Sequence, residues 1–128
     1  MAHIVVLGAG TGGMPCAYEL RDALGKEHEI TVINEREYFQ FVPSNPWLAV
    51  DWRKRDDITF DMRPHLERRG INFIDKRCEA IIAAESTLVL ENKESIKYDY
   101  LVIATGPRLM FEEVEGSGPV VGNTHSIC

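Results

Sequence analysis

Apolar positions at the start of the chain follow first the period of a strand and then that of a helix. Residues 3–7 (HIVVL) predict a buried strand. Apolar residues then recur at helical spacing, at Met14, Ala17, Leu20 and Leu24. A second apolar run over residues 29–33 (EITVI) predicts another strand. The order strand, helix, strand predicts a β-α-β unit with parallel strands.

Aromatic residues and prolines dominate the next segment, residues 36–57. Pro43 and Pro46 predict that this segment contains neither a regular helix nor a central strand. A loop of this length in a compact domain is usually functional or disordered, and the aromatic content argues against disorder. We therefore expect an ordered loop that covers a ligand. A surface loop whose aromatic side chains pack on the core is the alternative.

The second half of the chain predicts one short helix and a series of strands. Asp61 is placed to cap the helix, Pro64 lies in its first turn and Gly70 ends it. The predicted strands are residues 71–74, 78–83, 87–90, 96–98 and 98–104. Polar turns separate the middle three, which predicts a three-stranded antiparallel meander. The last strand is almost continuously apolar, which is typical of a buried parallel strand.

A glycine turn joins the first strand to the helix in the pattern G-x-G-x-x-G, at Gly8, Gly10 and Gly13. The first glycine allows a sharp turn, the second lets the backbone approach a pyrophosphate, and the third lets the helix pack close to the sheet. Glu35 follows Gly13 by 22 residues, near the spacing at which a carboxylate binds an adenosine ribose and repels a 2′-phosphate. The fold class is therefore α/β, with a Rossmann-like β-α-β core, a parallel sheet and the meander. A flexible glycine loop without a ligand is the alternative.

Composition and charge exclude some classes of partner. The net charge of −6 argues against a nucleic-acid partner. No apolar stretch is long enough to span a membrane and the start of the chain has no signal peptide, so we expect a cytoplasmic location. The cysteines, Cys16, Cys78 and Cys128, are odd in number and widely spaced. They predict neither a disulfide framework nor a metal site.

Several motifs together carry a resemblance to a known family. The glycine pattern, the meander and residues 98–106 (YDYLVIATG), in this order, resemble the FAD-binding half of the two-dinucleotide-binding-domain flavoproteins. Within that superfamily, residues 41–47 (FVPSNPW) and 126–128 (SIC) resemble the sulfide:quinone oxidoreductases. The resemblance runs over residues 1–128 but covers only the N-terminal part of such an enzyme. We therefore expect this chain to be an incomplete N-terminal FAD-binding domain of a larger flavoenzyme.

The resemblance implies FAD as the cofactor and assigns residues to it. The glycine turn would hold the pyrophosphate, and Asn34 with Glu35 would face the adenosine ribose. Backbone groups of residues 77–78 would touch the adenine, and Val42 and Asn45 would lie near the flavin. The complete implied set is Gly8, Ala9, Gly10, Thr11, Gly12, Gly13, Asn34, Glu35, Val42, Asn45, Arg77, Cys78, Thr105 and Gly106.

The resemblance also implies a reaction. Sulfide would be oxidised through a cysteine persulfide and FAD, and quinone would then reoxidise the flavin. Cys128 matches one of the family's cysteines, and we expect either an accessory catalytic thiol or an inert terminal one. Cys16 and Cys78 are expected to be small buried residues without a redox role.

Other functions remain open. A sulfide dehydrogenase that passes electrons to a cytochrome, or a type II NADH:quinone oxidoreductase, would share the fold. A non-catalytic dinucleotide-binding module would bind its ligand tightly without turnover. If the sulfide:quinone interpretation is right, the parent enzyme is peripheral on a membrane, docked through C-terminal parts outside this chain. We expect the chain alone to be inactive, to bind FAD weakly or not at all, and to self-associate through exposed apolar surface.

Overall fold

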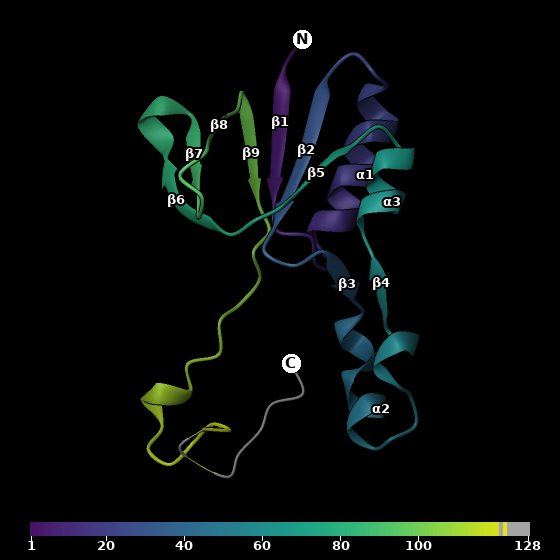
Figure 1. Ribbon diagram of the computed structural model, residues 1–128, viewed down its shortest axis with the longest axis vertical. Coiled ribbons are helices and arrows are strands. Elements are labelled where there is room, and N and C mark those ends of the chain that lie inside the picture. Colours follow the sequence, from purple (N-terminus) through teal and green to yellow (C-terminus); the bar gives the residue numbers. More distant parts are fainter. Residues whose placement is uncertain (121, 123–128) are drawn as a thin grey trace.

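The computed structural model describes residues 1–120 and 122 and is built around a parallel sheet (Figure 1). The sheet has four strands in the order β5-β2-β1-β9. Their bounds are His3–Leu7 for β1, Glu29–Asn34 for β2, Asn72–Asp75 for β5 and Tyr100–Ile103 for β9. Every pairing in this sheet is parallel, so the carboxyl ends of the strands meet at one edge. The predicted α/β class is confirmed.

Two helices cover one face of the parallel sheet (Figure 1). Their bounds are Gly13–Leu24 for α1 and Arg63–Arg68 for α3. Ala17 of α1 and Leu66 of α3 are fully buried in one cluster with Val6 and Val32 of the sheet. This burial of apolar surface stabilises the helices on the sheet. No helix in the described part of the chain is long and apolar enough to cross a membrane.

A three-stranded antiparallel sheet lies on the opposite face, as the turns predicted (Figure 1). Its strands are β6 (Cys78–Ile82), β7 (Thr87–Leu90) and β8 (Ser95–Lys97). Leu88 and Leu90 of β7 are fully buried in a second cluster with Val5 and Ile33. The parallel sheet is therefore packed on both faces, which explains its continuously apolar central strands.

The segment after β2 is ordered and forms a separate projection (Figure 1). Its elements are β3 (Tyr38–Gln40), α2 (Asn45–Ala49) and β4 (Thr59–Asp61), with β3 and β4 paired antiparallel. The prediction that Pro43 and Pro46 exclude a helix is wrong, because Pro46 lies in the first turn of α2, where no intrahelical amide bond is lost. Arg53 donates to the buried hydroxyl of Ser44 and lies 4.9 Å from the centre of the Trp47 ring. These contacts join the later part of the segment to α2 and the residue before it.

Strand β9 is an edge strand, which corrects the expectation of a buried one. Tyr100 and Ile103 are 66% and 61% exposed, because no segment among residues 1–120 pairs with the outer edge of β9. Its other two residues, Leu101 and Val102, pack against the two cores. The local sequence predicted the strand, but the presence of a neighbour is not a local property.

The start of α3 also differs in detail from the prediction. The helix begins at Arg63, and Asp61 belongs to β4 rather than to the cap position. The Asp61 carboxylate still accepts a hydrogen bond from the Arg63 amide, at 3.0 Å. The acid therefore satisfies a first-turn amide as expected, from one residue further away.

A buried arginine ties the helical layer to its loops. Arg21 of α1 is 8% exposed and donates to the carbonyls of Gly25, His28 and Gly70, at 2.6, 3.1 and 2.7 Å. Gly25 and Gly70 follow the ends of α1 and α3, where carbonyl groups lack helical partners. The guanidinium therefore fixes both helix ends at once.

Candidate functional site

A cleft of about 1060 Å³ lies at the carboxyl ends of the parallel strands. Ligands of open α/β sheets bind at this edge. The cleft is lined by all of the predicted cofactor residues except Gly13, namely Gly8, Ala9, Gly10, Thr11, Gly12, Asn34, Glu35, Val42, Asn45, Arg77, Cys78, Thr105 and Gly106. Cys128 lies outside the described residues. The chain therefore brings five separate sequence segments to one cavity.

The glycine turn forms one wall of the cleft. Gly8 has φ +98°, and a Cβ there would lie 2.3 Å from the carbonyl oxygen of Ala104. A Cβ at Gly13 would lie 1.9 Å from the carbonyl oxygen of Gly8, so α1 starts in direct contact with the turn. Gly13 therefore packs against the glycine turn and does not line the cleft itself. Both positions require glycine for reasons of space.

The middle of the turn faces open space instead. Nothing lies within 4 Å of a Cβ built at Gly10 or Gly12. In the part of the chain that the structure describes, the amides of Gly10, Thr11 and Gly12 have no hydrogen-bond partner. They precede the positive end of the α1 dipole. Free amides beside a helix N-terminus suit an anionic group such as a diphosphate.

The end of β2 contributes a carboxamide and a carboxylate. Asn34 accepts a hydrogen bond from the Ala9 amide through Oδ1, at 3.0 Å, and donates through Nδ2 to the Arg36 carbonyl, at 2.8 Å. Glu35 lines the same cleft as the glycine turn, with its side chain 57% exposed. Its Oε1 lies 3.9 Å from Nε of Arg36, a loose and solvated ion pair.

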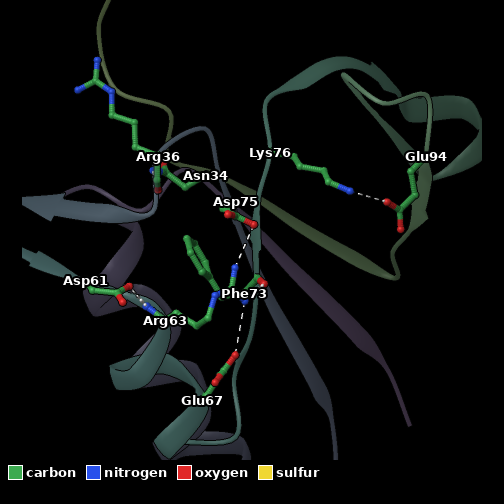
Figure 2. Close-up of polar contacts among 9 residues, drawn as sticks. All are labelled: Asn34, Arg36, Asp61, Arg63, Glu67, Phe73, Asp75, Lys76 and Glu94. Carbon is green, nitrogen blue, oxygen red and sulfur yellow. Dashed lines mark hydrogen bonds and ion pairs between the residues drawn. The ribbon is translucent and has the colours of Figure 1, made fainter.

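Salt bridges join the end of β5 to α3, and the residue after it to the β7–β8 turn (Figure 2). Arg63 of α3 donates to Asp75 at 3.0 Å and to the carbonyl of Phe73 at 3.2 Å. Asp75 pairs with Asn34 in the register of the sheet. Next in the chain, Lys76 bonds Glu94 of the β7–β8 turn at 3.1 Å. These contacts fix the segment that carries Lys76 and Arg77 to the cleft.

The meander supplies a further wall that contains a cysteine. The Cys78 thiol donates to the carbonyl of Ala80 at 3.4 Å, where β6 has an irregular register against β7. Burial raises the pKa of the Cys78 thiol. A protonated thiol is a poor nucleophile. The geometry therefore offers no support for a redox role of Cys78.

The β3–α2 segment closes the far end of the cleft. Gln40 donates through Nε2 to Oδ1 of Asn45, at 2.8 Å. Tyr38 and Gln40 both line the cleft, and neither was predicted. Their alternation in β3 is the sequence signal that places both on one face. Other lining residues that were missed include Arg36, Lys76, Glu79 and Ile81.

Among residues 1–120 and 122, no three histidine, cysteine or carboxylate side chains gather in a geometry suited to a metal ion. The polar groups of the cleft include amides, guanidinium and ammonium groups, hydroxyls and carboxylates. These groups suit a phosphorylated organic ligand.

The sheet, the glycine turn and the cleft together have the architecture of the dinucleotide-binding fold. The chain belongs to the pyridine nucleotide-disulphide oxidoreductase family, which it matches over residues 2–128. It is 42% identical, over 126 residues, to the sulfide-quinone reductase of Aquifex aeolicus (strain VF5), and this match covers 98% of the chain and 28% of that protein. The mitochondrial sulfide:quinone oxidoreductase of Mus musculus is 26% identical over 133 residues, with coverage of 98% and 28%.

The fold is also that of a solved relative. The crystal structure of the sulfide:quinone oxidoreductase from Aquifex aeolicus matches this chain with a TM-score of 0.89 and 42% identity, over 100% of this chain and 29% of that one. The chain spans 28% of the length of both curated relatives. The predicted resemblance to sulfide:quinone oxidoreductases is confirmed at the level of sequence and fold. These relationships imply a flavin cofactor.

Proposed function

We propose that this chain is the FAD-binding portion of a flavin-dependent sulfide:quinone oxidoreductase. The observation that carries the proposal is the cleft, which gathers the glycine turn, the end of β2 and the start of the meander around one space. The identity of 42% with the Aquifex enzyme favours sulfide and quinone as substrates over the alternatives. The longer enzyme would oxidise sulfide and reduce quinone.

The residues present fit FAD at its diphosphate. The amides of Gly10, Thr11 and Gly12 have no partner among the described residues, and nothing lies within 4 Å of a Cβ built at Gly10 or Gly12. This open space beside free amides would hold the diphosphate. Glu35 would accept hydrogen bonds from the ribose hydroxyls. Backbone groups of residues 77–78 would contact the adenine. When bound, FAD would supply a two-electron carrier between the two substrates.

The flavin end of the site would be built by the projection and by the turn after β9. Val42 and Asn45 line the cleft there, and Gln40 holds the Asn45 carboxamide at 2.8 Å. Thr105 and Gly106 line the cleft from the end of β9. Together these groups would orient the cofactor and limit access of water to it.

The role of Cys128 rests on the resemblance alone. We place it in the proposal as an accessory thiol of sulfide oxidation, because thiolates are the groups that exchange sulfur covalently. The remaining redox cysteines and the membrane-docking parts would belong to sequence outside this chain. The parent enzyme would be cytoplasmic and peripheral on the membrane, and the chain alone would be inactive and self-associate through surface that includes Tyr100 and Ile103.

The test is anaerobic addition of sulfide to the full-length protein while the flavin absorbance is followed. Bleaching by sulfide and recovery on addition of quinone is the expected result. Bleaching by NADH but not by sulfide would replace the proposal with an NADH:quinone oxidoreductase. Recovery with a cytochrome but not with quinone would indicate a sulfide dehydrogenase. Tight, reversible nucleotide binding without any reduction would indicate a binding module.

A further inference from the structure

Both ends of the Asn34 carboxamide form hydrogen bonds with the main chain. Its Oδ1 accepts from the Ala9 amide at 3.0 Å, and its Nδ2 donates to the Arg36 carbonyl at 2.8 Å. The two partners belong to different loops, one following β1 and the other following β2. A side chain engaged in this way is a structural link, whereas the sequence predicted a ligand contact at this position.

The first of these bonds shapes the anion-binding turn. The Gly8 amide donates to the Ile33 carbonyl at 2.8 Å, and the next amide, of Ala9, donates to Asn34. Two successive amides are therefore turned toward β2. The following amides, of residues 10–12, are left for the cleft. Ala9 is only 3% exposed, so water cannot readily replace Asn34 as its partner.

The second bond shapes the acidic side of the cleft. Glu35 lies between Asn34 and Arg36 in sequence, and the Asn34 side chain bonds back to Arg36. The backbone that carries Glu35 is thereby held on both sides. Small polar side chains that bond the backbone two residues on stabilise turns of this kind.

A carboxamide satisfies both partners, because one needs an acceptor and the other a donor, whereas an ionised carboxylate can only accept. An aspartate at position 34 would keep the bond to the Ala9 amide and lose the donor toward Arg36. It would also stand next to Asp75, which pairs with position 34 across the sheet and is itself bonded by Arg63. Sequence position alone does not separate this positioning role from a ligand contact.

We infer that Asn34 is a positioning residue that sets the glycine turn and the Glu35 loop in their binding conformations, while Glu35 alone of the two contacts the ribose. The inference rests on the proposed nucleotide site and divides two tasks between neighbouring residues. Substitutions of Asn34 and of Glu35 should therefore have different effects on amide exchange and on nucleotide binding.

The test compares Asn34→Ala and Asn34→Asp with the matched control Glu35→Gln. The first readout, in the ligand-free chain, is hydrogen exchange of the Ala9 amide by NMR. The second is the affinity for ADP and for 2′-deoxy-ADP, followed by amide shifts. Asn34→Ala should speed exchange at Ala9 and weaken both nucleotides by about tenfold, with their ratio unchanged.

The other variants should behave differently. Asn34→Asp should keep Ala9 protected, which also shows that position 34 tolerates substitution, and should weaken both nucleotides. Glu35→Gln should leave Ala9 exchange unchanged and remove the preference for ADP over 2′-deoxy-ADP. Unchanged Ala9 exchange in Asn34→Ala, or loss of the nucleotide preference in that variant, would overturn the inference. Absence of nucleotide binding by the unmodified chain would count against the proposed function, and Ala9 exchange would still decide the role of Asn34.

Discussion

Two glycines of the same turn should respond in opposite ways to substitution by alanine. At Gly13 the new Cβ would lie 1.9 Å from the Gly8 carbonyl oxygen, whereas at Gly10 nothing lies within 4 Å. Gly10 is not among the glycines with positive φ, so alanine can adopt its conformation. Gly13→Ala therefore tests the packing of α1, and Gly10→Ala tests the cleft.

The magnitude for Gly13→Ala follows from the size of the clash. Cβ atoms essentially never lie within 3.0 Å of another heavy atom, so α1 and the turn must separate by about 1 Å or more. Both partners are backbone, which cannot rotate away. We expect a loss of about 3 kcal/mol in the free energy of unfolding, at the upper end of typical overpacking costs. This loss corresponds to a fall of roughly 10 °C in Tm for a domain of this size.

Gly10→Ala should leave the fold intact. Its free energy of unfolding should be unchanged or raised by about 0.4–1 kcal/mol, because alanine restricts the unfolded chain. Its methyl group would occupy the space in front of the free amides, so binding of ADP should weaken by about tenfold or more. Urea unfolding followed by circular dichroism, and ADP titration followed by NMR, measure the two effects.

The pair of variants separates stability from binding. A Gly10→Ala variant that binds ADP like the unmodified chain would refute the diphosphate site at this turn. A Gly13→Ala variant as stable as the unmodified chain would refute the packing described at the start of α1.

Arg21→Met should lower the free energy of unfolding, measured in urea, by about 2 kcal/mol. The variant loses hydrogen bonds to three carbonyls, and this loss is partly offset because a buried Nε without a partner is also removed. A change under about 0.5 kcal/mol would contradict the proposal that Arg21 fixes the two helix ends. Cys78 should be alkylated more slowly than free cysteine near pH 8, because burial raises the pKa of the Cys78 thiol. The two rates should approach each other only at higher pH, as measured by mass spectrometry of the labelled peptide. Equal rates at pH 8 would argue against the burial of Cys78. The pKa of Glu94 is lowered by hydrogen bonds from Asn92 and Lys76, so its stabilising effect is present above the ordinary carboxyl pKa and is lost as pH falls through the lowered one. Glu94→Gln should therefore lose less stability than the unmodified chain between neutral and acid pH, and an identical acid unfolding curve would contradict this.

The β-α-β unit was predictable because each of its parts has a local cause. Gly8 must adopt φ +98°, and Gly13 has no room for a side chain, so the glycine pattern follows from the geometry of the turn. The meander was predictable from its polar turns, and it buries Leu88 and Leu90 of β7 against the parallel sheet. Local signals of this kind can be recognised in the sequence without knowledge of the rest of the fold.

Other features depend on partners that are distant in sequence. The exposure of Tyr100 depends on whether another strand lies beside β9, and its apolar sequence gives no information on that point. Tyr38 and Gln40 were missed because β3 is only three residues long and is defined by its pairing with β4. Residue type does not say whether the Asn34 carboxamide faces a ligand or the main chain, and its bonds to Ala9 and Arg36 come from two loops that only the fold brings together.

The central claim is that the amides of residues 10–12 bind the diphosphate of FAD. The most direct measurement is a titration of the ¹⁵N-labelled chain with FAD, followed amide by amide in ¹H–¹⁵N spectra, which detects weak binding as well as tight binding. We predict saturable shifts that are largest at Gly10, Thr11 and Gly12, with smaller shifts at Glu35 and Arg77. Saturable shifts confined to other surfaces, with none at the glycine turn, would contradict the claim.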